Sequence, residues 1–177
     1  MRRATGLLRL IPSVSARDLT LRGDIKVSTT EGAQRLSTLL KGHVSAIFGL
    51  PDLGSVCADH VASFIHSADA LKAAGVAKIL CVSVNKPSVV DQWLKEKGAD
   101  KIVQGVADDT GALTRMLGVN VSDPERPQLR CQRFAAIVDD GILIKMRVED
   151  SPGDLNASKA DTIIGILDDM KALKAAA

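Results

Sequence analysis

The cysteines at positions 57, 81 and 131 are the side chains of this sequence best suited to nucleophilic or redox chemistry. A thiolate is a strong nucleophile, whereas a protonated thiol is a poor one. The wide spacing of the three cysteines fits neither a CxxC redox motif nor a zinc site, and their odd number argues against a disulfide framework. Cys81 lies inside an apolar run, where a cysteine is usually a small buried hydrophobe. We therefore expect three reduced thiols, with Cys57 as the candidate for reactivity.

Cys57 lies at the predicted start of a long helix. Residues 50–55 contain Pro51 and Gly54, which break the chain, and apolar side chains then recur at close to helical spacing through residues 56–74. Gly75 follows as the expected residue just beyond the helix end. The N-terminus of a helix carries a partial positive charge that stabilises a thiolate. This position would lower the pKa of Cys57.

The histidines and paired acids do not predict a metal site. His60 and His66 are six residues apart on one predicted helix, so they face different sides and cannot bind one metal ion together. We expect both to be surface or helix-edge residues. The sequence predicts no metal and no cofactor.

Short apolar runs alternate with helical patterns along the body of the chain. Buried strands are predicted at residues 46–50 and 77–84, and a helix carrying Trp93 at residues 88–97. A short strand is expected from residue 102, a helix at 108–117, a hairpin at 134–148 and a last helix at 158–172. The hairpin prediction depends on Asp140-Gly141 between two apolar runs. Residues 119–128, with two prolines, are expected to form a loop.

This order predicts an α/β fold in which a mixed β-sheet is covered by helices on both faces. The length of 177 residues suits one domain, which we place at residues 18–177. Apolar residues make up 46% of the chain, aromatic residues only 2%, and the net charge is +2. Without a basic face or aromatic platforms, nucleic acid is not an expected partner. No apolar run is long enough to predict a membrane span.

Residues 1–17 differ in composition from the rest of the chain. They contain four arginines, several apolar residues, and no Asp or Glu. This composition is typical of a mitochondrial targeting segment, with the matrix as the expected destination. A solvated basic arm that is kept in the mature protein is the alternative.

Six segments, in the right order, resemble the atypical two-cysteine peroxiredoxins of type II and type five, within the redoxin family. The resemblance runs from about residue 25 to residue 164 and implies a thioredoxin-like fold. The segments are residues 47–51, 70–76, 81–85 with Trp93, 107–112, 133–134 and 138–141.

The resemblance implies an antioxidant thiol-dependent peroxidase that reduces hydrogen peroxide or organic hydroperoxides through Cys57. Arg133 would stabilise the thiolate and polarise the peroxide. Ser55 stands where the family has a threonine whose hydroxyl binds the substrate, and Pro51 matches the proline that shields the pocket. The oxidised cysteine would be a sulfenic acid that a thiol can reduce.

The active loop departs from the family pattern. The family has P-x-x-x-T-x-x-C, whereas this chain has Pro51-x-x-x-Ser55-x-Cys57, and the step from Cys57 to His60 is also one residue shorter. Losing one residue from a helical turn rotates a side chain by about 100°. Asp52 also places a negative charge near a site that favours a thiolate.

The resolving cysteine of the family, where present, aligns near Ala157, so we expect no intramolecular disulfide. Two functions remain open. The first is a one-cysteine peroxidase that uses an external thiol reductant. The second is a catalytically degenerate protein, a pseudoenzyme, serving as a structural or accessory subunit of a mitochondrial complex. The family also suggests a homodimer.

Overall fold

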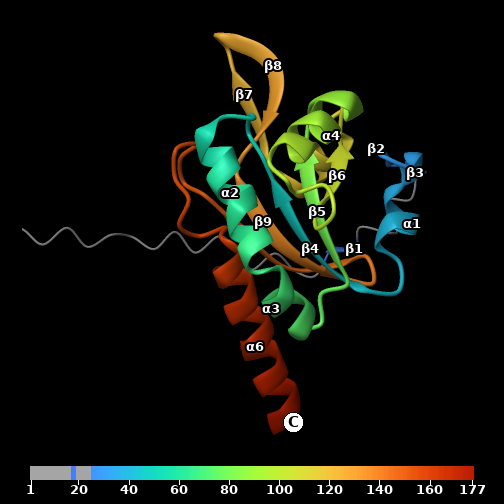
Figure 1. Cartoon of the computed structure of the whole chain (residues 1–177), viewed down its shortest axis with the longest axis vertical. Coiled ribbons are helices and arrows are strands. Elements are labelled where there is room, and N and C mark those ends of the chain that lie inside the picture. The colour runs from blue at the N-terminus through green and yellow to red at the C-terminus, as the bar shows by residue number, and fades with distance from the viewer. Residues whose placement is uncertain (1–16, 19–24) are drawn as a thin grey trace, which may run out of the picture.

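The computed structural model describes residues 17–18 and 25–177, so residues 1–16 of the predicted targeting segment lie outside the described part of the chain. In this part the main sheet has eight strands in the order β1-β10-β9-β4-β5-β6-β2-β3 (Figure 1). The strands are β1 (Arg17–Asp18), β2 (Lys26–Thr29), β3 (Gly32–Arg35), β4 (Val44–Gly49), β5 (Lys78–Ser83), β6 (Gln104–Ala107), β9 (Phe134–Asp139) and β10 (Ile142–Val148). The sheet is mixed, because β4, β5 and β6 run parallel and the remaining pairs are antiparallel.

The central strands are buried on both faces, which explains their almost continuous apolar sequences. Alternate residues of β4 point to opposite sides: Phe48 packs in one core cluster and Ile47 in the other. Gly49 is required where β4 passes β9, because a Cβ at this position would overlap the Phe134 ring. The sheet therefore separates two hydrophobic cores.

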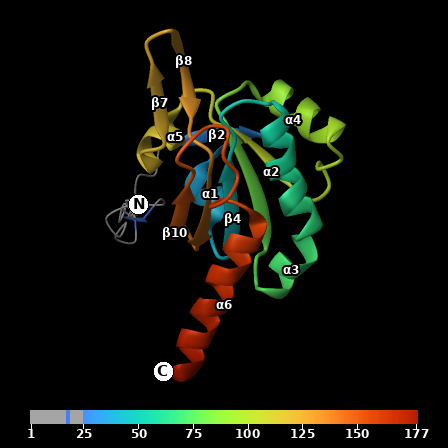
Figure 2. The ribbon, with the colours of Figure 1, turned by 90° about the vertical axis from the view of Figure 1, so that its left-hand side faces the viewer.

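Helices cover both faces of the sheet, as the alternating pattern predicted. Core residues of α2, α3, α4 and α6 pack on one face, and those of α1 and α5 on the other (Figures 1 and 2). The helices are α1 (Leu36–Leu40), α2 (Ser55–His66), α3 (Ala68–Ala73), α4 (Pro87–Glu96), α5 (Ala112–Leu117) and α6 (Ala160–Ala176).

Several predicted boundaries are wrong. The long helix predicted over residues 56–74 is broken at Ser67, whose backbone leaves the helical region and whose hydroxyl donates to Asp161 of α6. The strand expected from residue 102 starts at Gln104, and the helix expected from residue 108 starts at Ala112. Gly75 does follow the end of α3 with a positive φ, and Asp140-Gly141 does form the predicted turn.

The prediction of a loop over residues 119–128 is also wrong. Most of this segment belongs to a separate two-stranded hairpin, which consists of β7 (Asn120–Asp123) and β8 (Arg126–Cys131). Figure 1 shows the hairpin projecting beyond the main sheet, next to the start of α2. Among the described strands, β7 and β8 pair only with each other, so they do not need the apolar alternation of a core strand.

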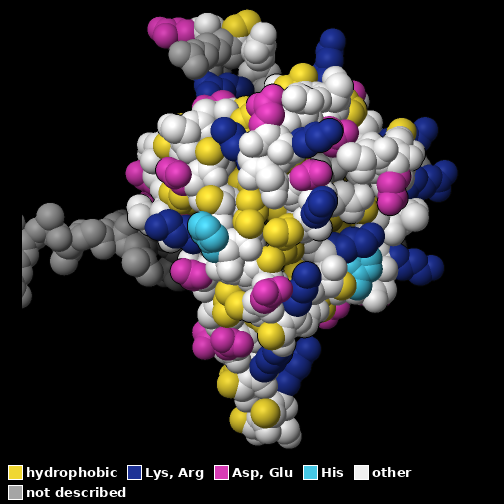
Figure 3. All heavy atoms as spheres, in the orientation of Figure 1, with side chains coloured by type: hydrophobic (Ala, Val, Ile, Leu, Met, Phe, Trp, Pro, Cys, Tyr) yellow, Lys and Arg dark blue, Asp and Glu magenta, His cyan; other side chains and the backbone are white. Residues whose placement is uncertain are grey.

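The surface in Figure 3 shows acidic and basic side chains interspersed over the visible face. Within the described residues, no helix combines the length and apolar character needed to cross a bilayer. The last turns of α6 extend away from the body of the molecule (Figure 2), and Leu173 there is 72% exposed.

Candidate active site

Cys57 is the third residue of α2 and is completely buried. Gly54, which precedes the helix, has an extended backbone, and its carbonyl accepts the Ala58 N–H to close the first turn. Cys57 therefore faces the core, at the end of α2 that lies close to the end of β4. The structure places the predicted nucleophile at a helix start, as the sequence indicated.

Asp52 contacts the sulfur directly. The Cys57 thiol donates a hydrogen bond to Asp52 Oδ1 over 3.1 Å, and the Gly54 N–H donates to the same oxygen over 2.8 Å. The second oxygen, Oδ2, lies 3.7 Å from Arg130 Nη2 on β8. The negative charge that stood out in the sequence of the active loop is thus part of the site itself.

Arg133 also contacts the sulfur. It directly precedes β9, is 2% exposed, and donates from Nη1 to Cys57 Sγ over 3.4 Å. Its Nη2 donates to the Pro152 carbonyl over 3.1 Å, while its Nε is buried and has no hydrogen-bond partner among the described residues. A buried guanidinium with a free N–H beside a thiol can bind the oxygens of a small polar substrate.

Glu149 fixes the segment that holds Arg133. Its Oε1 accepts the backbone N–H groups of residues 156, 157 and 158 and the Ser158 hydroxyl. Its own backbone N–H donates to the Arg133 carbonyl over 2.9 Å. We call residues 149–158 the strap. No pattern in the sequence singles out Glu149 or Arg130, because their contacts depend on distant segments of the chain.

Burial sets the protonation of the sulfur. Burial raises the pKa of the Cys57 thiol, and the Asp52 carboxylate adds to the rise, while hydrogen bonds from the Asp52 backbone and Arg133 oppose it. The Gly54 N–H lowers the pKa of Asp52, and Arg130 and Arg133 contribute to the lowering. The pair at rest is therefore a thiol beside a carboxylate. The pKa depression expected from the helix start is outweighed by burial.

Two hollows flank the active loop. One of about 150 Å³ is lined by Pro51, Arg133, Glu149 and Pro152, among others. A second of about 570 Å³ lies between the loop and the β7–β8 hairpin, with Asp52, Asn85 and Arg130 in its lining. Pro51 borders both hollows. The smaller one leads to Arg133 and is large enough for a peroxide.

The structure brings Cys57, Arg133 and Pro51 together, but not Ser55. Ser55 is the exposed first residue of α2, and no hydrogen bond in the described part of the chain joins it to the sulfur or to Arg133. Cys81 and Cys131 are buried free thiols. Burial raises the pKa of Cys81 far above its usual value and that of Cys131 to about 12, so both are protonated.

The expectation that His60 lies at a helix edge is wrong. Its ring is completely buried, lies 5.0 Å from the Phe48 ring and 5.6 Å from the Phe64 ring, and its Nε2 donates to the Ser158 carbonyl over 2.8 Å. His66 is exposed on α2, as predicted. The described residues contain no group of three or more His, Cys, Asp or Glu side chains that could hold a metal ion.

Trp93 is a core residue, as predicted, and it also supports the active loop. It is 8% exposed, and its indole N–H donates to the Leu53 carbonyl over 3.0 Å. This hydrogen bond attaches the loop that carries Asp52 to α4.

Comparison with protein families matches residues 10–164 to the Redoxin family. The chain is 34% identical over 146 residues to the mitochondrial Peroxiredoxin-2F of Arabidopsis thaliana, covering 80% of this chain and 72% of the relative. It is 36% identical over 133 residues to Peroxiredoxin-2B of the same plant, covering 73% of this chain and 82% of the relative. These values place the chain among the peroxiredoxins.

Solved structures agree on the fold. Reduced Prx3 from Vibrio vulnificus superposes with a TM-score of 0.79 at 28% identity, covering 86% of this chain and 97% of the other. Peroxiredoxin 5 from Alvinella pompejana gives 0.76 at 19% identity, covering 88% and 99%. The predicted thioredoxin-like fold is confirmed. The chain belongs to the redoxin family and is a peroxiredoxin-like thiol peroxidase.

Proposed function

We propose that Cys57 is the peroxidatic residue, and that it reduces hydrogen peroxide or organic hydroperoxides with Arg133 as its anion-stabilising partner. The observation that carries this proposal is the buried contact of 3.4 Å between Arg133 Nη1 and Cys57 Sγ. The free Nε of Arg133 supplies a further donor for a peroxide oxygen. Pro51 borders both hollows, and Ser55 lies at the exposed start of α2.

The reaction balances without a metal or cofactor. The sulfur attacks one peroxide oxygen, an S–O bond forms, the O–O bond breaks, and water or an alcohol leaves after taking up a proton. Cys57 is then a sulfenic acid. One external thiol condenses with it and releases water, and a second thiol reduces the mixed disulfide and regenerates Cys57.

The proposal assigns a one-cysteine cycle, because Ala157 stands where a resolving cysteine aligns and its N–H is held by Glu149. It also assigns a mitochondrial location, with the matrix as the compartment. The Arg-rich composition of residues 1–17 and the mitochondrial names of two plant relatives support this. A homodimer is part of the same proposal.

The test is peroxide consumption with a small thiol as reductant, comparing the wild type with C57S and C81S. We expect C57S to reduce the rate to that of the uncatalysed reaction, and C81S to keep most of it. A folded wild-type protein that consumes no peroxide would contradict the proposal. Co-migration of that inactive protein with a large mitochondrial assembly would favour the pseudoenzyme alternative.

A further inference from the structure

Peroxide reduction requires a proton to move, and the site contains one acceptor placed for it. At rest the sulfur is protonated, so the S–H bond must break as the S–O bond forms. The oxygen that leaves from the O–O bond is a strong base, so it must gain a proton. General acid–base catalysis requires a group within about 2.6–3.2 Å of the proton that it moves.

Asp52 is the group that meets this requirement. Its Oδ1 accepts the thiol hydrogen bond over 3.1 Å. Arg133 also contacts the sulfur, but a guanidinium stays protonated and cannot accept a proton. His60 is buried among aromatic rings, and its Nε2 is bonded to the Ser158 carbonyl rather than to the sulfur. The other charged group facing Asp52 is Arg130, which keeps the carboxylate ionised.

We propose that Asp52 is a catalytic residue that carries the proton of the reaction from Cys57 to the leaving oxygen. This inference rests on the proposed function of Cys57. As the sulfur attacks the peroxide, the S–H proton passes to Asp52 and the S–O bond forms while the O–O bond breaks. The resulting carboxylic acid then donates the same proton to the hydroxide or alkoxide. The products are a sulfenic acid, water or an alcohol, and the original carboxylate.

The surroundings of Asp52 suit both halves of this transfer. The Gly54 N–H, Arg130 and Arg133 keep the carboxylate ionised at neutral pH, which is the form that can accept a proton. Its side chain is 54% exposed, so it can also meet the leaving group of a substrate. With a base at this position, the buried sulfur can react without first becoming a free thiolate in a site that excludes water.

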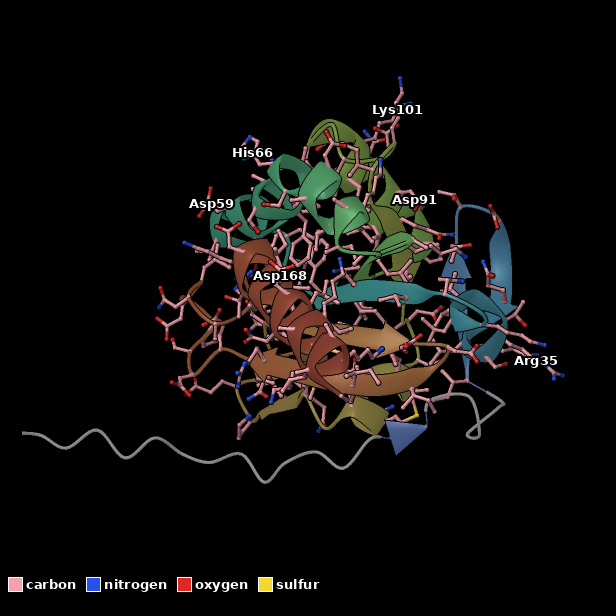
Figure 4. All side chains as sticks on the ribbon, turned by 90° about the horizontal axis from the view of Figure 1, so that it is seen from below. Arg35, Asp59, His66, Asp91, Lys101 and Asp168 are labelled. Atoms are coloured by element: carbon pink, nitrogen blue, oxygen red, sulfur yellow. The ribbon has the colours of Figure 1, made fainter. Side chains whose placement is uncertain are left out.

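The experiment separates the effect of proton transfer by Asp52 from the effect of its negative charge on Cys57. Asp52→Asn keeps an oxygen for the Gly54 N–H but removes the base and the negative charge. Asp59→Asn on the exposed side of α2 is the matched control (Figure 4). Two rates are measured across pH 6–9: alkylation of Cys57 by iodoacetamide, and oxidation of Cys57 by hydrogen peroxide in a single turnover.

We expect D52N to alkylate as fast as the wild type or faster, because the thiolate forms more easily beside a neutral amide. We expect its oxidation by peroxide to fall about 100-fold, the low end of what general acid–base catalysis contributes. D59N should leave both rates unchanged. Asp52→Ala should show the same loss, and added formate should restore part of its peroxide rate without changing that of the wild type.

Peroxide oxidation of D52N that is as fast as the wild type, or faster, would overturn this inference and leave the role of Cys57 intact. Failure of formate to restore D52A, while D52N and D52A both fold, would also count against it. A wild-type protein without Cys57-dependent peroxide consumption would overturn both the proposed function and this inference. These outcomes are distinguishable because alkylation reports on Cys57 independently of peroxide.

Discussion

Arg133 stabilises the sulfur by geometry as well as by charge. Its two terminal nitrogens have different partners, because Nη1 donates to Cys57 Sγ and Nη2 donates to the Pro152 carbonyl. A lysine would keep the positive charge, but it cannot make both contacts in the plane of a guanidinium.

We therefore expect Arg133→Lys to lower the rate of Cys57 oxidation by peroxide about 100-fold, the usual cost of losing one donor that stabilises developing charge. Stopped-flow measurement of a single turnover checks this. Arg130→Lys is the matched control, because a lysine there keeps an ion pair with Asp52 and should change the rate little. A wild-type rate in Arg133→Lys would show that charge alone matters.

At the scale of elements, the strap links the active site to the N-terminus of α6. One oxygen of Glu149 accepts three backbone N–H groups and a hydroxyl, and Glu149 is only 6% exposed. These hydrogen bonds lower the pKa of the carboxyl group against the effect of burial. The strap keeps the Pro152 carbonyl in place to receive Arg133.

Replacing Glu149 with Ala should lower the free energy of unfolding by about 2 kcal/mol, because buried N–H groups lose their acceptor. Urea unfolding followed by circular dichroism measures this. Asp150→Ala is the control, since Asp150 is exposed and adjacent. If the unfolding curve of E149A overlays that of D150A, the strap keeps its conformation without the Glu149 carboxylate.

Strong apolar patterns predicted most of the core elements but not all of them, since α1, with its buried Leu36, Leu39 and Leu40, was not predicted. Apolar runs such as residues 77–84 locate the central strands, because those strands are buried on both faces. The β7–β8 hairpin gave no such signal, since it pairs only with itself and contains Pro127 in a strand. The break at Ser67 was hidden because apolar periodicity continues across it.

For the site, the sequence located Cys57 by its place at a helix start, and the family resemblance supplied Arg133. These two residues are 76 positions apart, so no local pattern could bring them together. Asp52 was visible as an unusual charge, but its contact with the sulfur depends on the path of residues 51–54. Glu149 lies in a polar stretch whose role appears only when the strap is folded.

At the scale of the whole molecule, the buried His60 makes stability depend on pH. Burial lowers the pKa of His60 to about 4 in the folded protein, below its ordinary value of 6.5. The unfolded chain therefore binds a proton first as the pH falls. The stability contributed by the neutral ring is present above pH 6.5 and is lost between pH 6.5 and about 4, by about 1.4 kcal/mol per pH unit.

As the pH falls through this window, we expect the wild type to lose unfolding free energy relative to His60→Gln. Urea unfolding at half-unit intervals of pH checks this. His66→Gln, an exposed position on the same helix, should follow the wild type throughout. Parallel curves for the wild type and H60Q would show that His60 does not control acid stability.

The complete enclosure of Cys57 has a consequence for the oxidised protein. The Cys57 sulfur has no exposed surface and is packed in the core, so we expect residues 51–54 to move when the sulfenic acid forms. The carbonyl of Leu53 would then pull away from the indole of Trp93, the only tryptophan in the chain. The emission wavelength of the intrinsic tryptophan fluorescence would thus change with the redox state of Cys57, so that Trp93 would report on turnover.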